Sequence, residues 1–248
     1  MNAVVNEQVE KPTPFELSQE LEIADLYERY RTHQRVRVAD VLAGSGALQL
    51  HRHLSGAFQW NTFVVAAETV YSGESDSDTL SAALDGAQKG FACVFDANRL
   101  FAEDVPDGVT LAARPDTALL TQLHTFVNSN EFIGLCREVT GLSAIQRAAV
   151  RATQYRQGHF SLFHGQLPYD ARKGRRLIEF ELNLTIEWKP EWGGLRHFKL
   201  ARDYASEAYT PSFNVLDLFS PVKGRWVSPV APYAGQSRLA VGGWLYGP

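Results

Sequence analysis

Histidines are the residues of this sequence best suited to hold a metal or move a proton, and seven occur along the chain: His33, His51, His53, His124, His159, His164 and His197. A mononuclear non-haem iron site needs two histidines and one carboxylate on one face. His159 and His164 flank the extended segment FSLF, and their spacing of five puts them on opposite faces of a strand. Spacing alone therefore predicts no metal site, and it makes His164 a polar residue at a strand end.

Other motifs that carry chemistry are missing from the sequence. It has no glycine-rich phosphate loop, no nucleophile elbow and no paired cysteines at metal-binding spacing. Cys93 in FACVF and Cys136 in FIGLCREV stand among apolar residues. This setting favours buried, unreactive thiols over a disulfide or a cysteine metal site.

Composition excludes several classes of partner. The 248 residues carry 24 Lys and Arg against 28 Asp and Glu, and the net charge of −4 argues against a nucleic-acid surface. No apolar run approaches the roughly 18–20 residues of a membrane span. Residues 1–20 lack the basic start and apolar core of a secretory signal. We therefore expect a cytoplasmic protein without a membrane or nucleic-acid partner.

The elements expected in the N-terminal half are mainly helical. Residues 1–14 contain two prolines and no periodic pattern, so we expect a flexible leader before a single domain at 15–248. Apolar spacing predicts helices at 15–30, 43–56 and 79–90, with strands near 35–42 and 60–70. It also predicts two helices within 116–141, broken at 128–130 and stopped by Gly141.

Short alternating segments replace the helical pattern after Gly141. We expect strands within 177–188, 195–200, 212–219, 225–230 and 238–247, separated by Gly, Pro and Asp. The last of these runs almost to Pro248, so it should lie inside the sheet. The sequence thus predicts an α+β domain in which a helical half packs on a β-sandwich or double-sheet barrel.

The segment TQYRQGHFSLFHGQ and the following RRLIEFELNLTIEWKPEWGGLRHF resemble the core of the iron/2-oxoglutarate-dependent dioxygenases, in their prolyl-4-hydroxylase-like branch. The residues that carry the resemblance are Tyr155, Gly158, Phe160, His164, Asn183, Trp188, Trp192, Gly193 and Gly194. The resemblance covers roughly residues 35–248. It implies a distorted double-stranded β-helix, or jelly roll, supported by N-terminal helices.

The resemblance also implies where iron and 2-oxoglutarate would bind. His164 matches the first iron ligand, but Gln166 stands at the position of the aspartate. Arg225 aligns with the second histidine, and a shifted register would place Val227 or Ser228 there. Two of the three iron ligands are therefore missing. A positive Arg225 would favour an anion at the place where the family binds iron.

Two further residues match the 2-oxoglutarate-binding part of the family. Arg238 matches the arginine that pairs with the distal carboxylate of 2-oxoglutarate, and Tyr155 is the second candidate for that role. A guanidinium suits this task because it binds a carboxylate through two parallel hydrogen bonds. The alternative for Arg238 is a structural arginine paired with a neighbouring aspartate.

Three hypotheses follow. The first is a degenerate, catalytically inactive homologue that acts by binding a small carboxylate-bearing molecule or a protein partner. The protein partner could be a second copy of the chain, bound through residues 17–30. The second is an active 2-oxoglutarate-dependent hydroxylase whose Fe(II) is held by His164 with His159, His197 or Asp170. The third is a metal-independent enzyme with His164 as acid or base and Arg225 as electrostatic stabiliser. Fe(II) and 2-oxoglutarate are expected as cofactors only under the second.

Overall fold

The structure is a computed structural model, and it describes residues 14–56, 60–66, 69–73, 81, 84–88, 92–99, 118–164, 174–200 and 205–248. For His164 and for the strands within 61–73 and 92–99, only the backbone is described. Residues 1–13 of the expected leader, Gln166, Asp170 and half of the expected helix at 79–90 lie outside the described residues.

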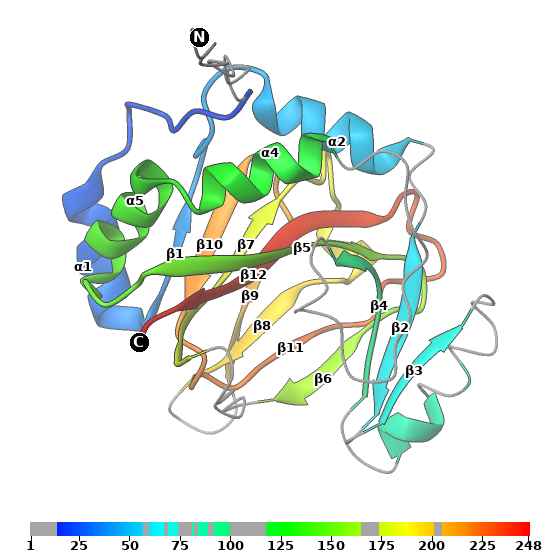
Figure 1. Cartoon of the computed structure of the whole chain (residues 1–248). Coiled ribbons are helices and arrows are strands. Elements are labelled where there is room, and N and C mark those ends of the chain that lie inside the picture. Colours follow the sequence, from blue (N-terminus) through cyan, green and yellow to red (C-terminus); the bar gives the residue numbers. More distant parts are fainter. Residues whose placement is uncertain are drawn as a thin grey trace, which may run out of the picture.

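Two layers of antiparallel strands form the body of the molecule (Figure 1). The first layer has the order β1 (Arg35–Val38), β10 (Val215–Phe219), β7 (Arg176–Asn183), β12 (Arg238–Tyr246) and β5 (Arg147–Tyr155). The second has the order β6 (Ser161–His164), β11 (Arg225–Val227), β8 (Arg196–Lys199) and β9 (Ser206–Tyr209). β4 (Ala92–Arg99) pairs with both β5 and β6 and joins the layers, while β2 (Asn61–Ala66) and β3 (Thr69–Gly73) extend the sheet from β4.

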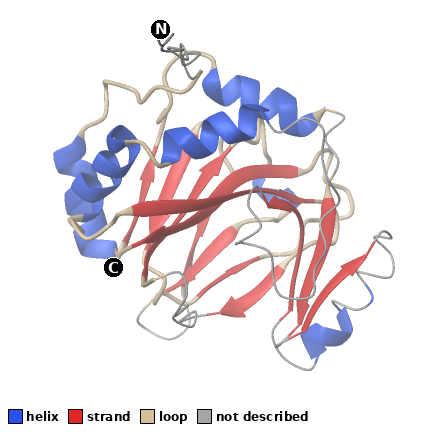
Figure 2. Cartoon of the chain, viewed as in Figure 1, coloured by secondary structure: helices blue, strands red, loops and turns tan. Residues whose placement is uncertain are grey.

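Four helices cover the outer face of the first layer (Figure 2). They are α1 (Ile23–His33), α2 (Gly46–Ser55), α4 (Ala118–Val127) and α5 (Asn130–Thr140). α4 and α5 separate because the Ser129 side chain accepts a hydrogen bond from the Phe132 N–H and starts a new helix. Gly141 ends α5 at a φ of 71°, in the left-handed region that glycine adopts readily. The predicted break at 128–130 and the predicted stop at Gly141 are both confirmed.

Strand β7 shows how the two sides of the first layer differ. Ile178, Phe180 and Leu182 belong to the hydrophobic core, and the Phe180 ring lies 5.8 Å from that of Phe132 in α5. Successive side chains of a strand point to opposite faces. Glu179 and Glu181 therefore face away from the helices, into the space between the two layers.

The fold confirms the predicted α+β jelly roll with N-terminal helices, including all five strands expected after residue 176. β12 is buried along its whole length, as expected for a strand inside the sheet. The helix expected at 15–30 begins only at Ile23, because Leu17 forms a β-bridge with Leu42. Cys136 is a buried free thiol, and burial raises its pKa well above the ordinary value.

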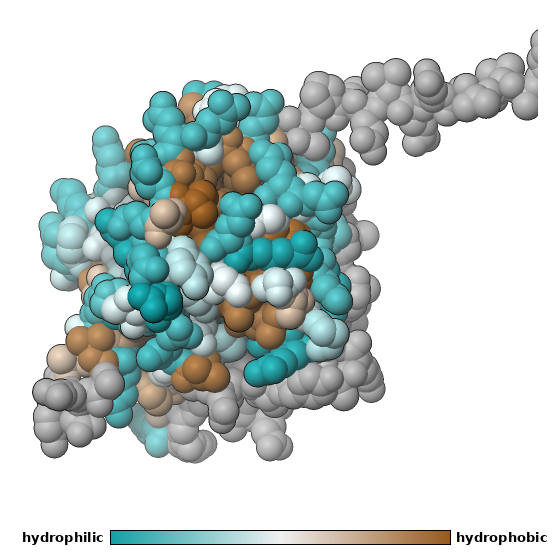
Figure 3. Space-filling view, turned by 90° about the vertical axis from the view of Figure 1, so that its left-hand side faces the viewer, coloured by the Kyte–Doolittle hydropathy of each residue, from teal (hydrophilic) through white to brown (hydrophobic). Residues whose placement is uncertain are grey.

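The surface around α1 and α5 is mixed in character (Figure 3). Apolar residues there form several separate patches between hydrophilic ones. A polar groove of about 690 Å³ lies between residues 16–23 and α5, and three glutamates line it: Glu16, Glu131 and Glu138. None of the described helices has the length and apolar character needed to cross a bilayer.

Candidate functional site

Arg225 lies directly opposite His164 in the antiparallel pair β11–β6. On its other side Arg225 pairs with Phe198 of β8, and both residues are fully buried. Their neighbours Trp226 and His197 point to the outer face of the same layer, since side chains alternate along a strand. Arg225, one of the three residues that the resemblance offers for the second histidine, is thus the direct strand partner of His164.

The Arg225 guanidinium makes its contacts inside the protein. One Nη donates to the Glu179 carboxylate of β7, and the other donates to the carbonyls of Pro221 (3.1 Å) and Lys223 (3.3 Å). Burial lowers the pKa of Arg225, and the positive charges of Arg196 and Arg151 lower it further, whereas Glu179 raises it. An arginine side chain nevertheless keeps its proton in proteins.

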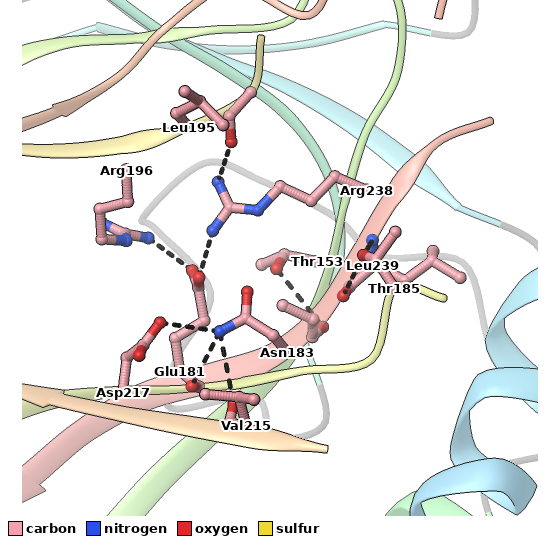
Figure 4. A network of polar contacts seen from close by, with 12 residues as sticks. Thr153, Glu181, Asn183, Thr185, Leu195, Arg196, Val215, Asp217, Arg238 and Leu239 are labelled. Carbon is pink, nitrogen blue, oxygen red and sulfur yellow. Dashed lines mark hydrogen bonds and ion pairs between the residues drawn. The ribbon is translucent and has the colours of Figure 1, made fainter. Parts of the chain in front are cut away.

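The pair Arg225–Glu179 begins an alternating row of charges, here named the charge ladder: Arg225, Glu179, Arg196, Glu181 and Arg238. Arg196 of β8 lies 3.9 Å from Glu179 and donates to Glu181 at 2.5 Å. Glu181 also pairs with Arg238 of β12 (Figure 4). The ladder crosses the interior, because its glutamates and Arg238 come from the first layer while Arg196 and Arg225 come from the second.

Glu181 is the most heavily bound acid of the ladder. Each of its carboxylate oxygens accepts from a different arginine, Oε2 from Arg196 and Oε1 from Arg238. Burial acts to raise the pKa of Glu181, but the charges and hydrogen bonds of Arg196 and Arg238 outweigh it and lower the pKa to about 2. Glu181 is therefore an anion throughout the neutral range.

Arg238 is positioned by groups other than Glu181. Its second Nη donates to the Gly194 carbonyl at 3.0 Å, and its Cζ lies 5.4 Å from the centre of the Tyr155 ring. Arg238 and Tyr155 are direct partners in the β12–β5 pair. The structure thus brings these two predicted residues together. Arg238 also has an acidic partner, as expected for a structural arginine, but the partner is the glutamate Glu181 and not an aspartate.

The WGG segment presents the Gly194 carbonyl to Arg238. Trp188 Nε1 donates to the Gly193 carbonyl at 2.9 Å, and Gly193 forms a β-bridge with Val230. Gly193 has a φ of 68°, and a Cβ there would lie 2.0 Å from the Pro229 oxygen. Only glycine fits this position, so the motif has a clear structural task beside the ladder.

A second buried acid continues the polar interior behind Glu181. Asp217 of β10 accepts from Asn183 at 2.9 Å (Figure 4). It also accepts from Arg37 of β1 at 2.8 and 3.1 Å. Burial raises the pKa of Asp217, although the hydrogen bond and charge of Arg37 oppose the rise. Asp217 and Arg37 therefore balance each other and add no net charge to the interior.

The two histidines proposed as replacement iron ligands, His197 and His159, make the following contacts. The ring of His197 stacks on Trp226 at 4.8 Å, on the outer face of β8, whereas Arg196 and Phe198 of the same strand are buried. His159 is buried, and its Nδ1 accepts from the Arg156 N–H at 3.2 Å within its own turn. Among the described residues, no three His, Cys, Asp or Glu side chains form a group that could hold a metal.

An apolar groove lies on the outer face of the second layer. It has a volume of about 600 Å³, and Phe163 and Trp226 line it together with residues of β6, β9 and the segment 226–229. Phe163 is 53% exposed, and its ring lies 6.1 Å from that of Trp226. This groove is separated from the charge ladder by the strands themselves.

Sequence reasoning missed Glu179, Glu181 and Arg196. The signal was present in LIEFELN, where the glutamates alternate with apolar residues that belong to the core. In a surface strand such alternation puts the charges in water. Here the second layer covers them, and their partners come from strands 15 to 57 residues away in the sequence.

Two antiparallel layers with helices on one of them define a double-stranded β-helix. A family model described as 2OG-Fe(II) oxygenase superfamily matches residues 150–246, which contain two thirds of β5 and every strand from β6 to β12. This segment is therefore similar to the 2OG-Fe(II) oxygenase superfamily in sequence as well as in fold. No curated protein matches the sequence.

Solved structures with the same fold include prolyl hydroxylases. A prolyl-4-hydroxylase from Pseudomonas putida aligns at 16% identity with a TM-score of 0.58, over 91% of this chain and 99% of its own. A prolyl hydroxylase from Trichoplax adhaerens aligns at 16% identity with a TM-score of 0.60, over 90% and 88% of the two chains. A 2OG-Fe(II) oxygenase family oxidoreductase from Burkholderia pseudomallei aligns at 12% identity with a TM-score of 0.57, over 93% and 92%.

Proposed function

We propose that this chain is a catalytically inactive member of the superfamily that acts through binding, without iron and 2-oxoglutarate turnover. One observation carries the proposal. Arg225, opposite His164, is a buried cation held by Glu179. In the family that the sequence resembles, this is the position of the second iron-binding histidine.

The charge of Arg225 opposes a divalent metal beside it. A guanidinium has no free lone pair to donate. A unit charge and a doubly charged ion about 4 Å apart repel by roughly 8 kcal/mol at an effective dielectric near 20. Gln166, at the position of the carboxylate ligand, is neutral and offers no compensating charge. The residues at this site therefore do not fit an iron ion bound in the family's manner.

The residues present do not fit 2-oxoglutarate either. Arg238, the residue expected to bind its distal carboxylate, already binds the Glu181 carboxylate. A dicarboxylate would have to displace a buried side chain whose two oxygens are both paired. Displacing an ion from such a buried pair is costly, because the freed charge loses its partner without gaining water.

A small carboxylate-bearing molecule is the ligand class that the remaining charge of the interior favours, provided that it binds without displacing Glu181. The ladder has three arginines against two glutamates. The adjoining Arg37 and Asp217 cancel, so a positive charge remains. Arginine is well suited to carboxylate recognition. A protein partner on the outer groove is the other form of binding that agrees with the proposal.

Calorimetric titration of the purified protein tests the absence of the metal site. Mn(II) alone, 2-oxoglutarate alone and both together would be added, with a prolyl 4-hydroxylase as the positive control. We expect no saturable heat from Mn(II) and no increase in 2-oxoglutarate affinity when Mn(II) is present. Tight one-to-one Mn(II) binding that is lost in His164→Ala would overturn the proposal.

A further inference from the structure

We propose that Arg196 and Arg238 form a carboxylate-binding fork whose resident occupant is the side chain of Glu181. Removing that side chain should open the fork to a small free carboxylate. The inference rests on the proposed function and deepens it by naming the residues that bind a carboxylate in the interior. In the wild type the Glu181 side chain fills the fork, so a free carboxylate is expected there only when that side chain is absent.

The geometry at Glu181 is that of a bound ligand. Its carboxylate projects from β7 between two guanidinium groups, and each oxygen accepts from one of them (Figure 4). The two arginines come from opposite layers, β8 and β12. A carboxylate held by two arginines is among the stronger charge-assisted contacts in proteins.

The fork does not depend on Glu181 for its position. Arg238 is also held by the Gly194 carbonyl at 3.0 Å and by the Tyr155 ring. Arg196 lies with its Cζ 5.0 Å from the centre of the Phe219 ring and with Nη1 3.9 Å from Glu179. Both guanidinium groups therefore keep neighbours that fix them when the Glu181 side chain is shortened.

Removal of the Glu181 side chain leaves uncompensated positive charge in the interior, which favours binding of an anion. The ladder would then contain three arginines and one glutamate, in an interior that water reaches poorly. The Nε atoms of Arg196 and Arg238 are buried and have no hydrogen-bond partner among the described residues. Buried donors without partners are costly, so a carboxylate that reaches them would stabilise the fold.

Acetate matches the space that a Glu181→Ala variant creates. The substitution removes a CH₂–COO⁻ group, which has the heavy atoms of acetate. The experiment is thermal unfolding of E181A in increasing sodium acetate, compared with sodium chloride at equal ionic strength and with neutral acetamide. Glu191→Ala, at an exposed glutamate, is the matched control.

We expect acetate to raise the Tm of E181A saturably, by roughly 5–10 °C above the chloride series. Wild type and E191A should show the same Tm in acetate and chloride. Equal effects of acetate and chloride on E181A would overturn the inference. So would an equal acetate-specific rise in E191A.

The variant Glu181→Gln tests whether rescue by acetate needs the empty space or only the loss of the negative charge. This variant removes the charge but fills the same space, so we expect it to be destabilised without being rescued by acetate. If E181A does not fold in chloride, its refolding yield in acetate replaces the Tm, and no gain in yield contradicts the inference. None of these measurements uses iron or 2-oxoglutarate. Metal-dependent turnover by the wild type would overturn the proposed function while leaving the acetate result unchanged.

Discussion

Arg225 of β11 and Glu179 of β7 form a buried ion pair that joins the two strand layers across the interior. The arginine is fully buried, and its other Nη binds two backbone carbonyls. Such a pair fills space and satisfies charge at the place where the superfamily resemblance would put an iron ligand. We therefore expect Arg225 to behave as a structural residue, with stability as the property it controls.

Removing only Arg225 should strongly destabilise the protein. Arg225→Met leaves Glu179 with Arg196 at 3.9 Å as its remaining ionic partner, and breaking a buried pair on one side typically costs about 3–5 kcal/mol. The double variant Glu179→Met with Arg225→Met should recover most of that loss, because the ladder keeps its wild-type net charge and Arg196 and Arg238 keep Glu181 as their partner. Urea unfolding of the two single variants and the double variant measures the coupling. Simply additive losses would contradict the pairing.

The ladder predicts a defined loss of stability in acid. Glu181 has a pKa lowered to about 2 from an ordinary value near 4.5, so its stabilising contribution is present above pH 4.5 and disappears as the pH falls towards 2. The contribution is on the order of 3 kcal/mol. Glu181→Gln lacks it, so the difference in unfolding free energy between wild type and this variant should shrink over that pH range. A difference that is constant from pH 6 to 2.5 would argue against the lowered pKa.

Gly193 should tolerate no side chain. A Cβ would meet the Pro229 oxygen at 2.0 Å, at a φ of 68°, and would disturb the carbonyl of Gly194 that binds Arg238. Gly193→Ala is expected to lower the Tm by roughly 10 °C or more, or to prevent folding. Gly134→Ala is the matched control, because Gly134 lies within α5 with no atom within 4 Å of its added Cβ. The control should gain about 0.5–1 kcal/mol. A similar decrease of the Tm in both variants would show that the contact between a Cβ at position 193 and the Pro229 oxygen does not cause the loss of stability.

His197 should titrate below its ordinary pKa. The cause is burial against Trp226, whose ring is nearly parallel to that of the histidine, at 6°. Trp226→Ala exposes the imidazole, so the pKa should rise towards 6.5. NMR titration of the His197 ring signals measures both values. An unchanged pKa in the variant would mean that Trp226 is not the group that buries His197.

The sequence predicted the parts of the fold whose signals are local. The break before α5 follows from an N-cap serine, and its end follows from a glycine that can adopt a positive φ. The helix α1 begins later than the apolar spacing predicts, because Leu17 pairs with Leu42, a residue 25 positions further on. Apolar spacing alone cannot separate a helical turn from an extended segment that packs on the same core.

The sequence predicts only the arginines Arg225 and Arg238 of the candidate site, without their acidic partners. Alignment on the family pattern identified Arg225 and Arg238, and the structure places both in the interior. Their partners Glu179 and Glu181 were not identified, because whether a charged residue in a strand faces water depends on which layer covers it. Side-chain pairing across two layers is set by strand order, and the spacing of charges does not reveal that order.

Succinate formation from 2-oxoglutarate tests the central claim most directly. The purified protein would be incubated with Fe(II), ascorbate, oxygen and 2-oxoglutarate, and succinate would be measured against a heat-denatured sample and against His164→Ala. We predict no succinate above that of the denatured sample. Succinate that exceeds this background and disappears in His164→Ala would contradict the account.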